Sequence, residues 1–201
     1  MKTTGAAIKI FGLMISFLLI AITPSGAVAG EKEVVLDSGG QPVRANAPYY
    51  IWKPEERAWI SRYGNRTLSP FSCPRRVVLF SNAIVETPPP VIFVLLSSSD
   101  DVVRVSTELN IKFARRFFCR DESGYWRVAN SSLPIKDVVL SGSKSSYDST
   151  FTIQKSVNGS YKFAFGSADK PIDIGLDGIY PGISRLVLSN TSSFGVSFIP
   201  A

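Results

Sequence analysis

Residues 34–51 of the chain read VVLDSGGQPVRANAPYYI. An apolar strand start runs into the turn Ser38-Gly39-Gly40, where glycine adopts a positive φ without a Cβ clash. A second extended run begins at Tyr49 and is rich in aromatic and β-branched residues. This pattern predicts that the stretch opens an all-β domain.

The residues before this stretch have the pattern of a secretory signal peptide. Lys2 and Lys9 precede an apolar run from Ile10 to Ile22, and Ala27-Val28-Ala29 supplies a small-x-small cleavage site. The run is short for a membrane crossing, and no later segment is long and apolar enough for one. We therefore expect a signal peptide over residues 1–29 and a single mature domain over 30–201, secreted to the extracellular space or apoplast or delivered to the vacuole, with no membrane contact in the mature form.

Charge and composition exclude several function classes. The chain has 22 basic and 16 acidic side chains, a formal net charge of +6, and removal of the two lysines of the signal peptide leaves +4. The basic residues are scattered and accompany no nucleic-acid-binding motif, so no nucleic-acid partner is expected. The absence of histidine excludes Ser-His-Asp and Cys-His catalysis and histidine metal sites. We predict no enzyme, no catalytic residue, no metal and no cofactor.

Cysteines and glycosylation motifs agree with the secretory route. The two cysteines, Cys73 and Cys119, are an even count in an oxidising compartment, which favours one disulfide over two buried thiols. Four Asn-x-Ser/Thr motifs are possible glycosylation sites, at Asn65, Asn130, Asn158 and Asn190.

Short β-rich runs separated by Gly, Pro, Ser, Asn or Asp follow one another to the C-terminus, and no mature segment keeps a helical apolar period. The predicted strands are 49–53, 76–81, 91–96, 102–106, 109–113, 125–128, 138–141, 151–157, 161–165, 172–176, 185–189 and 194–199. About twelve strands in one chain is the number of a pseudo-threefold β-trefoil, whereas an immunoglobulin-like sandwich needs fewer.

The motifs resemble those of the plant Kunitz-type inhibitors, the legume-seed trypsin inhibitor and miraculin-like proteins, which are β-trefoils. The N-terminal pattern of that family is aliphatic-x-Asp-x-x-Gly-x-x-aliphatic, five residues, Tyr-x-aliphatic. Its positions are filled here by Val35, Asp37, Gly40, Val43, Tyr49 and Ile51. Similar segments follow in the family's order at Cys73-Pro74 with Val77-Val78, at 103–113, 125–128, 173–175 and 185–188, and Cys119 stands where the partner of Cys73 is expected.

The resemblance implies a substrate-like inhibitory loop between the fourth and fifth strands. Counting from the neighbouring motifs places it at Leu95, Leu96, Ser97, Ser98, Ser99, Asp100 and Asp101, with Ser97, Ser98 or Ser99 as the P1 residue. An asparagine braces this loop in trypsin-inhibiting members of the family, but the matching position is Ala45, and Asn46 is one residue away. This chain also has no cysteine after Cys119 for the second disulfide of many members.

The implied partner is a protease of the serine or cysteine class, or another hydrolase such as α-amylase, bound reversibly by a monomer. Trypsin is disfavoured because its acidic S1 pocket prefers Arg or Lys, and the two aspartates worsen the fit. The alternative is a non-inhibitory miraculin-like binding or storage protein on the same scaffold. Other hypotheses are a displaced site at Arg75-Arg76 or Arg115-Arg116, and sugar binding at Trp52 and Trp59. Trp126 is expected in the core.

Overall fold

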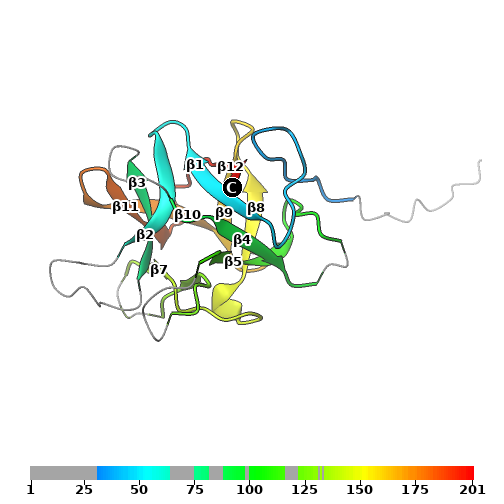
Figure 1. Ribbon diagram of the computed structural model, residues 1–201. Helices are drawn as coiled ribbons and strands as arrows, with labels where there is room; N and C mark the ends of the chain where they lie inside the picture. The colour runs from blue at the N-terminus through cyan, green and yellow to red at the C-terminus, as the bar shows by residue number, and fades with distance from the viewer. Residues whose placement is uncertain are drawn as a thin grey trace, which may run out of the picture. The chain divides into compact units, whose positions relative to one another are not determined.

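In the computed structural model, residues 31–63, 75–81, 88–97, 100–115, 122–130, 132 and 134–201 are described. They contain twelve β-strands and a single short 3-10 helix (Figure 1). The strands are β1 Pro48–Lys53, β2 Ala58–Tyr63, β3 Arg76–Ser81, β4 Val91–Leu95, β5 Glu108–Phe113, β6 Arg127–Val128, β7 Val138–Val139, β8 Phe151–Lys155, β9 Tyr161–Phe165, β10 Ile172–Tyr180, β11 Ile183–Leu188 and β12 Ser197–Pro200; the 3-10 helix η1 is Tyr147–Ser149. Within these ranges no helix is long and apolar enough to cross a membrane.

Six of the strands close into a ring of antiparallel pairs. β1 pairs with β4, β4 with β5, β5 with β8, and β8 with β9. A bridge between Tyr161 and Val196 then connects β9 to the segment before β12, and β12 pairs with β1. Closure of the ring satisfies the backbone groups that would otherwise be exposed at sheet edges.

The other six strands form three hairpins, β2–β3, β6–β7 and β10–β11, which contact one another in turn. β3 pairs with β11 and with β7, and a bridge between Asp137 and Val187 joins the third hairpin to the second. Each unit of four strands therefore gives two strands to the ring and one hairpin to the cap. This arrangement is a β-trefoil, as the sequence resemblance implies.

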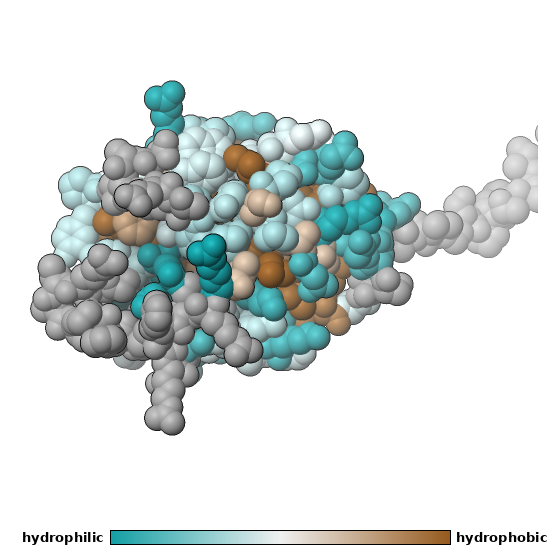
Figure 2. All heavy atoms as spheres, in the orientation of Figure 1, coloured by the Kyte–Doolittle hydropathy of each residue, from teal (hydrophilic) through white to brown (hydrophobic). Residues whose placement is uncertain are grey.

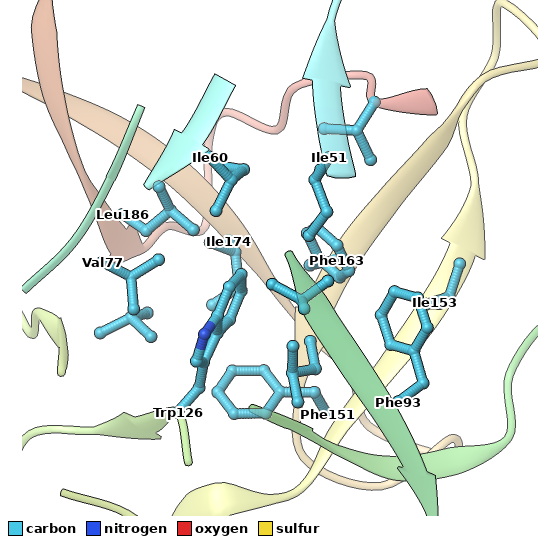
Figure 3. Close-up of a cluster of buried hydrophobic side chains, with 14 of the residues drawn as sticks. Ile51, Ile60, Val77, Phe93, Trp126, Phe151, Ile153, Phe163, Ile174 and Leu186 are labelled. Atoms are coloured by element: carbon cyan, nitrogen blue, oxygen red, sulfur yellow. The ribbon is translucent and has the colours of Figure 1, made fainter. Parts of the chain in front are cut away.

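Trp126 lies at the centre of the core and is fully buried. Its ring centroid is 6.0 Å from that of Phe113, 6.2 Å from Phe151 and 5.6 Å from Phe163 (Figure 3). These three rings come from β5, β8 and β9, so a side chain that follows the β5–β6 turn fastens three strands of the ring to one another. The prediction that Trp126 belongs to the core is confirmed.

Two details of the strand prediction are wrong. Strand β2 was not expected, because the turn before it, Pro54 to Arg57, contains no glycine; Arg57 itself adopts the left-handed conformation, with φ of 50°. The stretch 102–106 is not a regular strand but a bridged segment that ends in a turn at Ser106 (φ 57°). Its pairing partners lie in the N-terminal segment, far away in sequence.

Replacement of Trp126 by alanine is expected to lower the free energy of unfolding by about 3–5 kcal/mol, because it empties a closed aromatic site. Val157→Ala is the control, since Val157 is 99% exposed at the β8–β9 turn and should change stability by less than about 0.5 kcal/mol. Guanidinium unfolding followed by far-UV circular dichroism measures both. Equal stabilities of the two variants would contradict a core centred on Trp126.

Candidate functional site

The connection between β4 and β5 leaves the ring by a hydrogen-bonded leg. Leu95 pairs with Leu109, and the amide of Leu96 donates to the carbonyl of Glu108 at 3.4 Å. Leu95 and Leu96 are half-buried, whereas Ser97 is exposed. Ser98 and Ser99 lie outside the described residues. The first leg of the predicted inhibitory loop is therefore fixed as far as Leu96.

The N-terminal segment, residues 32–47, has two arms, residues 33–35 and residues 43–45. The second leg of the connection, residues 101–105, lies between these arms (Figure 1). The carbonyl of Val103 accepts from the amide of Val35 at 2.9 Å, and its own amide donates to the carbonyl of Val43 at 2.9 Å. At the two ends of the leg, the carbonyl of Asp101 accepts from the amide of Ala45 at 2.6 Å, and the amide of Val105 donates to the backbone carbonyl of Glu33 at 2.8 Å. The N-terminal segment thus grips this leg from both sides.

Ala45 and Asn46 support the loop through their backbone. Beside the bond from Ala45 to Asp101, the amide of Asn46 donates to the carbonyl of Phe93 in β4 at 2.9 Å. Asn46 has φ of 62°, a left-handed conformation that asparagine tolerates better than most residues. The two adjacent amides therefore contact strand β4 and the second leg of the β4–β5 connection.

Both aspartates of the predicted loop form ion pairs with arginines. Asp101 Oδ1 is 2.6 Å from Arg44 Nη1, and Asp100 Oδ2 is 3.0 Å from Arg104 Nη2. Asp100 Oδ1 also accepts from the amide of Val102 at 3.1 Å. The hydrogen bond from Arg104, followed by that from Val102, holds the pKa of Asp100 below its ordinary value of 3.8. The negative charge that the sequence places next to the serines is therefore balanced locally.

Arg44 and Arg104 are the residues that sequence reasoning missed. Arg104 follows Asp100 by four residues and could have been paired with it locally, but Arg44 is 57 residues from Asp101. Only the bridge between Arg44 and Val102 in the folded chain brings Arg44 to the loop.

In the two basic pairs, Arg75 and Arg76 contact acidic side chains of the fold. Arg76 Nε is 2.6 Å from Asp137 Oδ2, and the half-buried Arg75 contacts Glu122, with 3.8 Å between Nε and Oε1. Arg115 is exposed, and Arg116 lies outside the described residues. Ion pairing within the fold thus accounts for Arg75 and Arg76.

The tryptophans proposed for sugar binding contact each other. The ring centroids of Trp52 and Trp59 are 4.3 Å apart at a tilt of 48°, and both side chains are half-buried.

Of the predicted glycosylation sites, Asn130, Asn158 and Asn190 are exposed. Asn65, Cys73 and Cys119 lie outside the described residues, so the disulfide stays a prediction.

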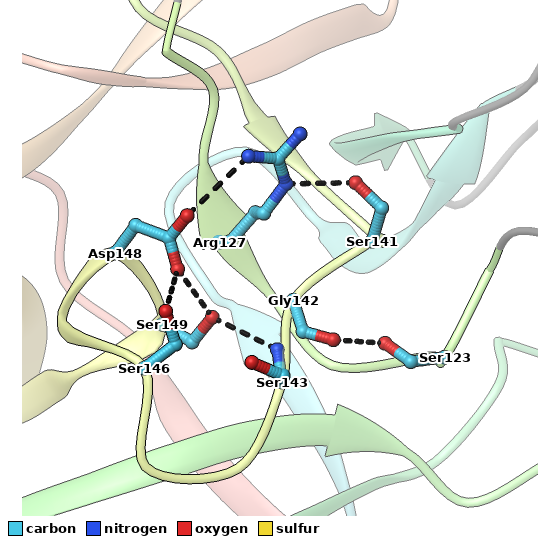
Figure 4. Close-up of polar contacts among 8 residues, drawn as sticks. All are labelled: Ser123, Arg127, Ser141, Gly142, Ser143, Ser146, Asp148 and Ser149. Carbon is cyan, nitrogen blue, oxygen red and sulfur yellow. Dashed lines mark hydrogen bonds and ion pairs between the residues drawn. The ribbon is translucent and has the colours of Figure 1, made fainter.

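A second cluster of polar side chains among the described residues lies at the β7–β8 connection (Figure 4). Asp148 accepts hydrogen bonds from Ser146 (2.7 Å), Ser149 (3.0 Å) and Arg127 (3.3 Å). Burial raises the pKa of Asp148, but these three donors outweigh it and hold the pKa below the ordinary value of 3.8. A carboxylate held in its charged form is a weak base, so the network fixes a loop and does not activate a serine for catalysis.

Side chains on the visible face of the molecule form no broad apolar patch among the coloured residues (Figure 2). Hydrophobic residues occur there as separate spots between hydrophilic ones. Within the described ranges, no group of three or more Cys, Asp or Glu side chains is arranged to hold a metal ion.

Comparison with known proteins matches this architecture to one family. A family model described as trypsin and protease inhibitor, of the legume Kunitz type, matches residues 35–199. The chain belongs to the Kunitz-type family of protease inhibitors. Kunitz trypsin inhibitor 6 of Arabidopsis thaliana is 42% identical over 185 residues, which cover 90% of this chain and 89% of that protein.

Two solved Kunitz-fold structures extend the comparison. The trypsin inhibitor from soybean superimposes with a TM-score of 0.69 at 23% identity, covering 84% of this chain and 99% of its own. The water-soluble chlorophyll protein of Brassica oleracea has a TM-score of 0.70 at 23% identity, covering 85% and 99%. These likenesses confirm the β-trefoil fold. Members of the Kunitz inhibitor family are inhibitors and not enzymes, in agreement with the sequence prediction.

Replacement of Asp148 by asparagine is expected to lower the free energy of unfolding by about 1 kcal/mol at pH 7, a modest value because the side chain is 39% exposed. The folded-state pKa is lowered, so the stabilisation is present above the ordinary pKa of 3.8 and is lost as the pH falls through the folded-state value. Urea unfolding between pH 7 and pH 2 measures both effects. A variant whose stability falls in acid as steeply as that of the wild type would contradict this role.

Proposed function

We propose that this Kunitz-type chain inhibits its target reversibly through the β4–β5 loop, residues 95–101. The observation that carries the proposal is that both legs of the loop are held by backbone hydrogen bonds, at Leu96 on one side and at Asp101 to Val105 on the other. A substrate-like inhibitor gains affinity when its loop is ordered before binding, because little conformational entropy is then lost. Three serines, Ser97 to Ser99, separate the two legs in the sequence, and the described Ser97 is exposed.

The composition of this span favours a target with a small or apolar S1 pocket, such as a subtilisin-like or elastase-like protease. Residues 95–101 read LLSSSDD and contain no Arg or Lys to pair with the buried carboxylate of trypsin. The ion pairs of Asp100 and Asp101 reduce the repulsion that these residues would exert on a protease, so the aspartates are compatible with binding. In this interpretation, the specificity of this chain differs from that of the relatives that are named as trypsin inhibitors.

We also propose that the protein acts as a secreted or vacuolar monomer with one disulfide. The N-terminal charge and apolar pattern supports a signal peptide over residues 1–29. An oxidising compartment supports pairing of Cys73 with Cys119. Exposure of Asn130, Asn158 and Asn190 is compatible with N-glycans at these positions.

Arginine placed in turn at positions 97, 98 and 99 identifies the P1 residue. We expect one of Ser97→Arg, Ser98→Arg and Ser99→Arg to gain trypsin inhibition by at least about a hundredfold, because a buried charge-assisted pair is created in the S1 pocket. The same variant should lose inhibition of subtilisin or elastase. Inhibition constants against trypsin, chymotrypsin, elastase, subtilisin, papain and α-amylase measure the change.

Ser145→Arg, in the exposed β7–β8 connection, is the matched control and should gain no trypsin inhibition. Inhibition that persists in all three variants at positions 97–99, with no gain against trypsin, would move the site to another loop. The wild type inhibiting none of the six enzymes would favour the non-inhibitory binding or storage alternative.

Processing in a plant secretory pathway tests the remaining proposals together. The purified protein is expected to begin at Gly30, to give one Cys73–Cys119 peptide under non-reducing conditions, and to carry glycans at one or more of the four motifs. Intact mass, N-terminal sequencing and peptide mapping measure these features. A retained residue 1–29 segment or two alkylatable thiols in the native protein would contradict the secretory interpretation.

A further inference from the structure

We propose that the ion pairs Arg44–Asp101 and Arg104–Asp100 are the positioning residues of the inhibitory loop, and that they make its order sensitive to acid. The inference rests on the function proposed above, because it assigns the device that keeps that loop in one conformation. None of the four residues needs to touch the target's reacting atoms. They act on the serines through the second leg of the loop.

The geometry gives each aspartate two attachments. Asp101 accepts from Ala45 through its backbone carbonyl at 2.6 Å and from Arg44 through its side chain at 2.6 Å. Asp100 accepts from Val102 at 3.1 Å and from Arg104 at 3.0 Å through its two carboxylate oxygens. Consecutive residues that immediately follow the serines are thus fixed by both backbone and charge.

Each arginine makes a second contact, Arg44 through its backbone and Arg104 through its side chain. The amide of Arg44 donates to the hydroxyl of Tyr49 at 2.9 Å, and Arg104 Nη1 donates to the carbonyl of Lys32 at 3.1 Å. An arginine that is held by a second contact loses less side-chain entropy when it pairs with a carboxylate. The Arg104–Asp100 pair should therefore order the loop more than an ordinary surface ion pair does.

The side chain at position 45 is a methyl group, so it offers no hydrogen bond to the loop. Only its backbone amide reaches Asp101. The neighbouring Arg44 provides the side-chain contact from this arm, and it provides a charge. Consequently the order of the loop depends on salt and on pH, which a neutral amide contact would not cause.

Asp100 gives the direction of the pH effect. Its pKa is lowered by Arg104 and Val102, so the contact is complete above 3.8 and is lost as the pH falls through the folded-state value. Other charged or titratable groups on the elements that face the two pairs are few within the described residues. In the N-terminal segment they are Lys32, which donates to the carbonyl of Ser106, Glu33, which pairs with Lys155, and Asp37, which accepts from the amides of Gly39 and Gln41. In the neighbouring strands they are Glu108 and Lys112 of β5 and Tyr49 of β1.

Amide hydrogen exchange tests the positioning role without any protease. We expect Arg44→Ala and Asp101→Ala each to speed exchange of the Ala45, Val102 and Val103 amides by about three- to tenfold, since an exposed but oriented pair is broken. The charge swap, Arg44→Asp combined with Asp101→Arg, should restore slow exchange. Global stability in urea should change little in any of these variants.

Lys162 and Asp173 supply a control ion pair away from the loop, with 2.8 Å between the charged atoms of β9 and β10, although both side chains are less exposed than Arg44 and Asp101. Lys162→Ala should leave exchange at the three loop amides unchanged. If the swap variant is unstable in urea, Arg44→Lys replaces it, and partial protection of the same amides is expected because the charge is kept. Unchanged exchange in Arg44→Ala and Asp101→Ala would overturn the proposal.

A pH titration of the Val102 amide chemical shift tests the acid sensitivity. The wild type is expected to show a step with a midpoint below 3.8, and Asp100→Asn should abolish it, because Asp100 Oδ1 is the acceptor of that amide. A wild-type step that survives in Asp100→Asn would overturn this part of the proposal.

Inhibition of subtilisin at pH 7 connects loop order to function. Arg44→Ala and Asp101→Ala should raise the inhibition constant by about three- to tenfold, and the charge swap should restore it. Absence of inhibition by the wild type would count against the proposed function while exchange still decides the positioning role. Faster exchange with an unchanged inhibition constant would overturn the link between the ion pairs and inhibition.

Discussion

Pairing of β1 with both β4 and β12 is the constraint on which the rest of the structure depends. It closes the six-stranded ring, and ring closure in turn creates the site that the aromatic core fills around Trp126. It also fixes the direction in which the chain enters β1. The segment 32–47 must therefore run past the end of β4, where the β4–β5 connection begins. One set of backbone pairings thus determines both the core and the surroundings of the candidate loop.

The candidate loop uses this neighbourhood instead of its own sequence for support. Residues 101–105 have no regular strand partner, yet their amides and carbonyls bond to residues 33–35 and 43–45. A surface segment held in this way can stay ordered without belonging to a regular strand. Charge then adds to the backbone contacts, because Arg44 pairs with Asp101 from one arm and Arg104, in the leg itself, pairs with Asp100.

Much of the fold could be predicted because its strands are short, β-branched and separated by turn residues, and because the Kunitz motifs fix their order. Strand β2 was missed because the turn at Arg57 adopts a positive φ without glycine, and turn patterns depend on glycine and asparagine. For the candidate site, the residues of the loop were easier to predict than the contacts that they make. The loop residues follow from neighbouring motifs, but contact between Arg44 and Asp101 depends on long-range pairing that no local pattern contains.

Kunitz-type scaffolds separate the fold from the partner. The soybean trypsin inhibitor and the Brassica oleracea chlorophyll protein superimpose on this chain almost equally well, so the trefoil by itself does not select a target. Selection must come from residues that the core leaves free to vary. In the site that we propose, those residues are the serines between Leu96 and Asp100, because Leu96 and Asp100 themselves make hydrogen bonds and an ion pair. If the proposed site is right, a change of specificity at the serines needs no change in the core, and one fold can carry different targets.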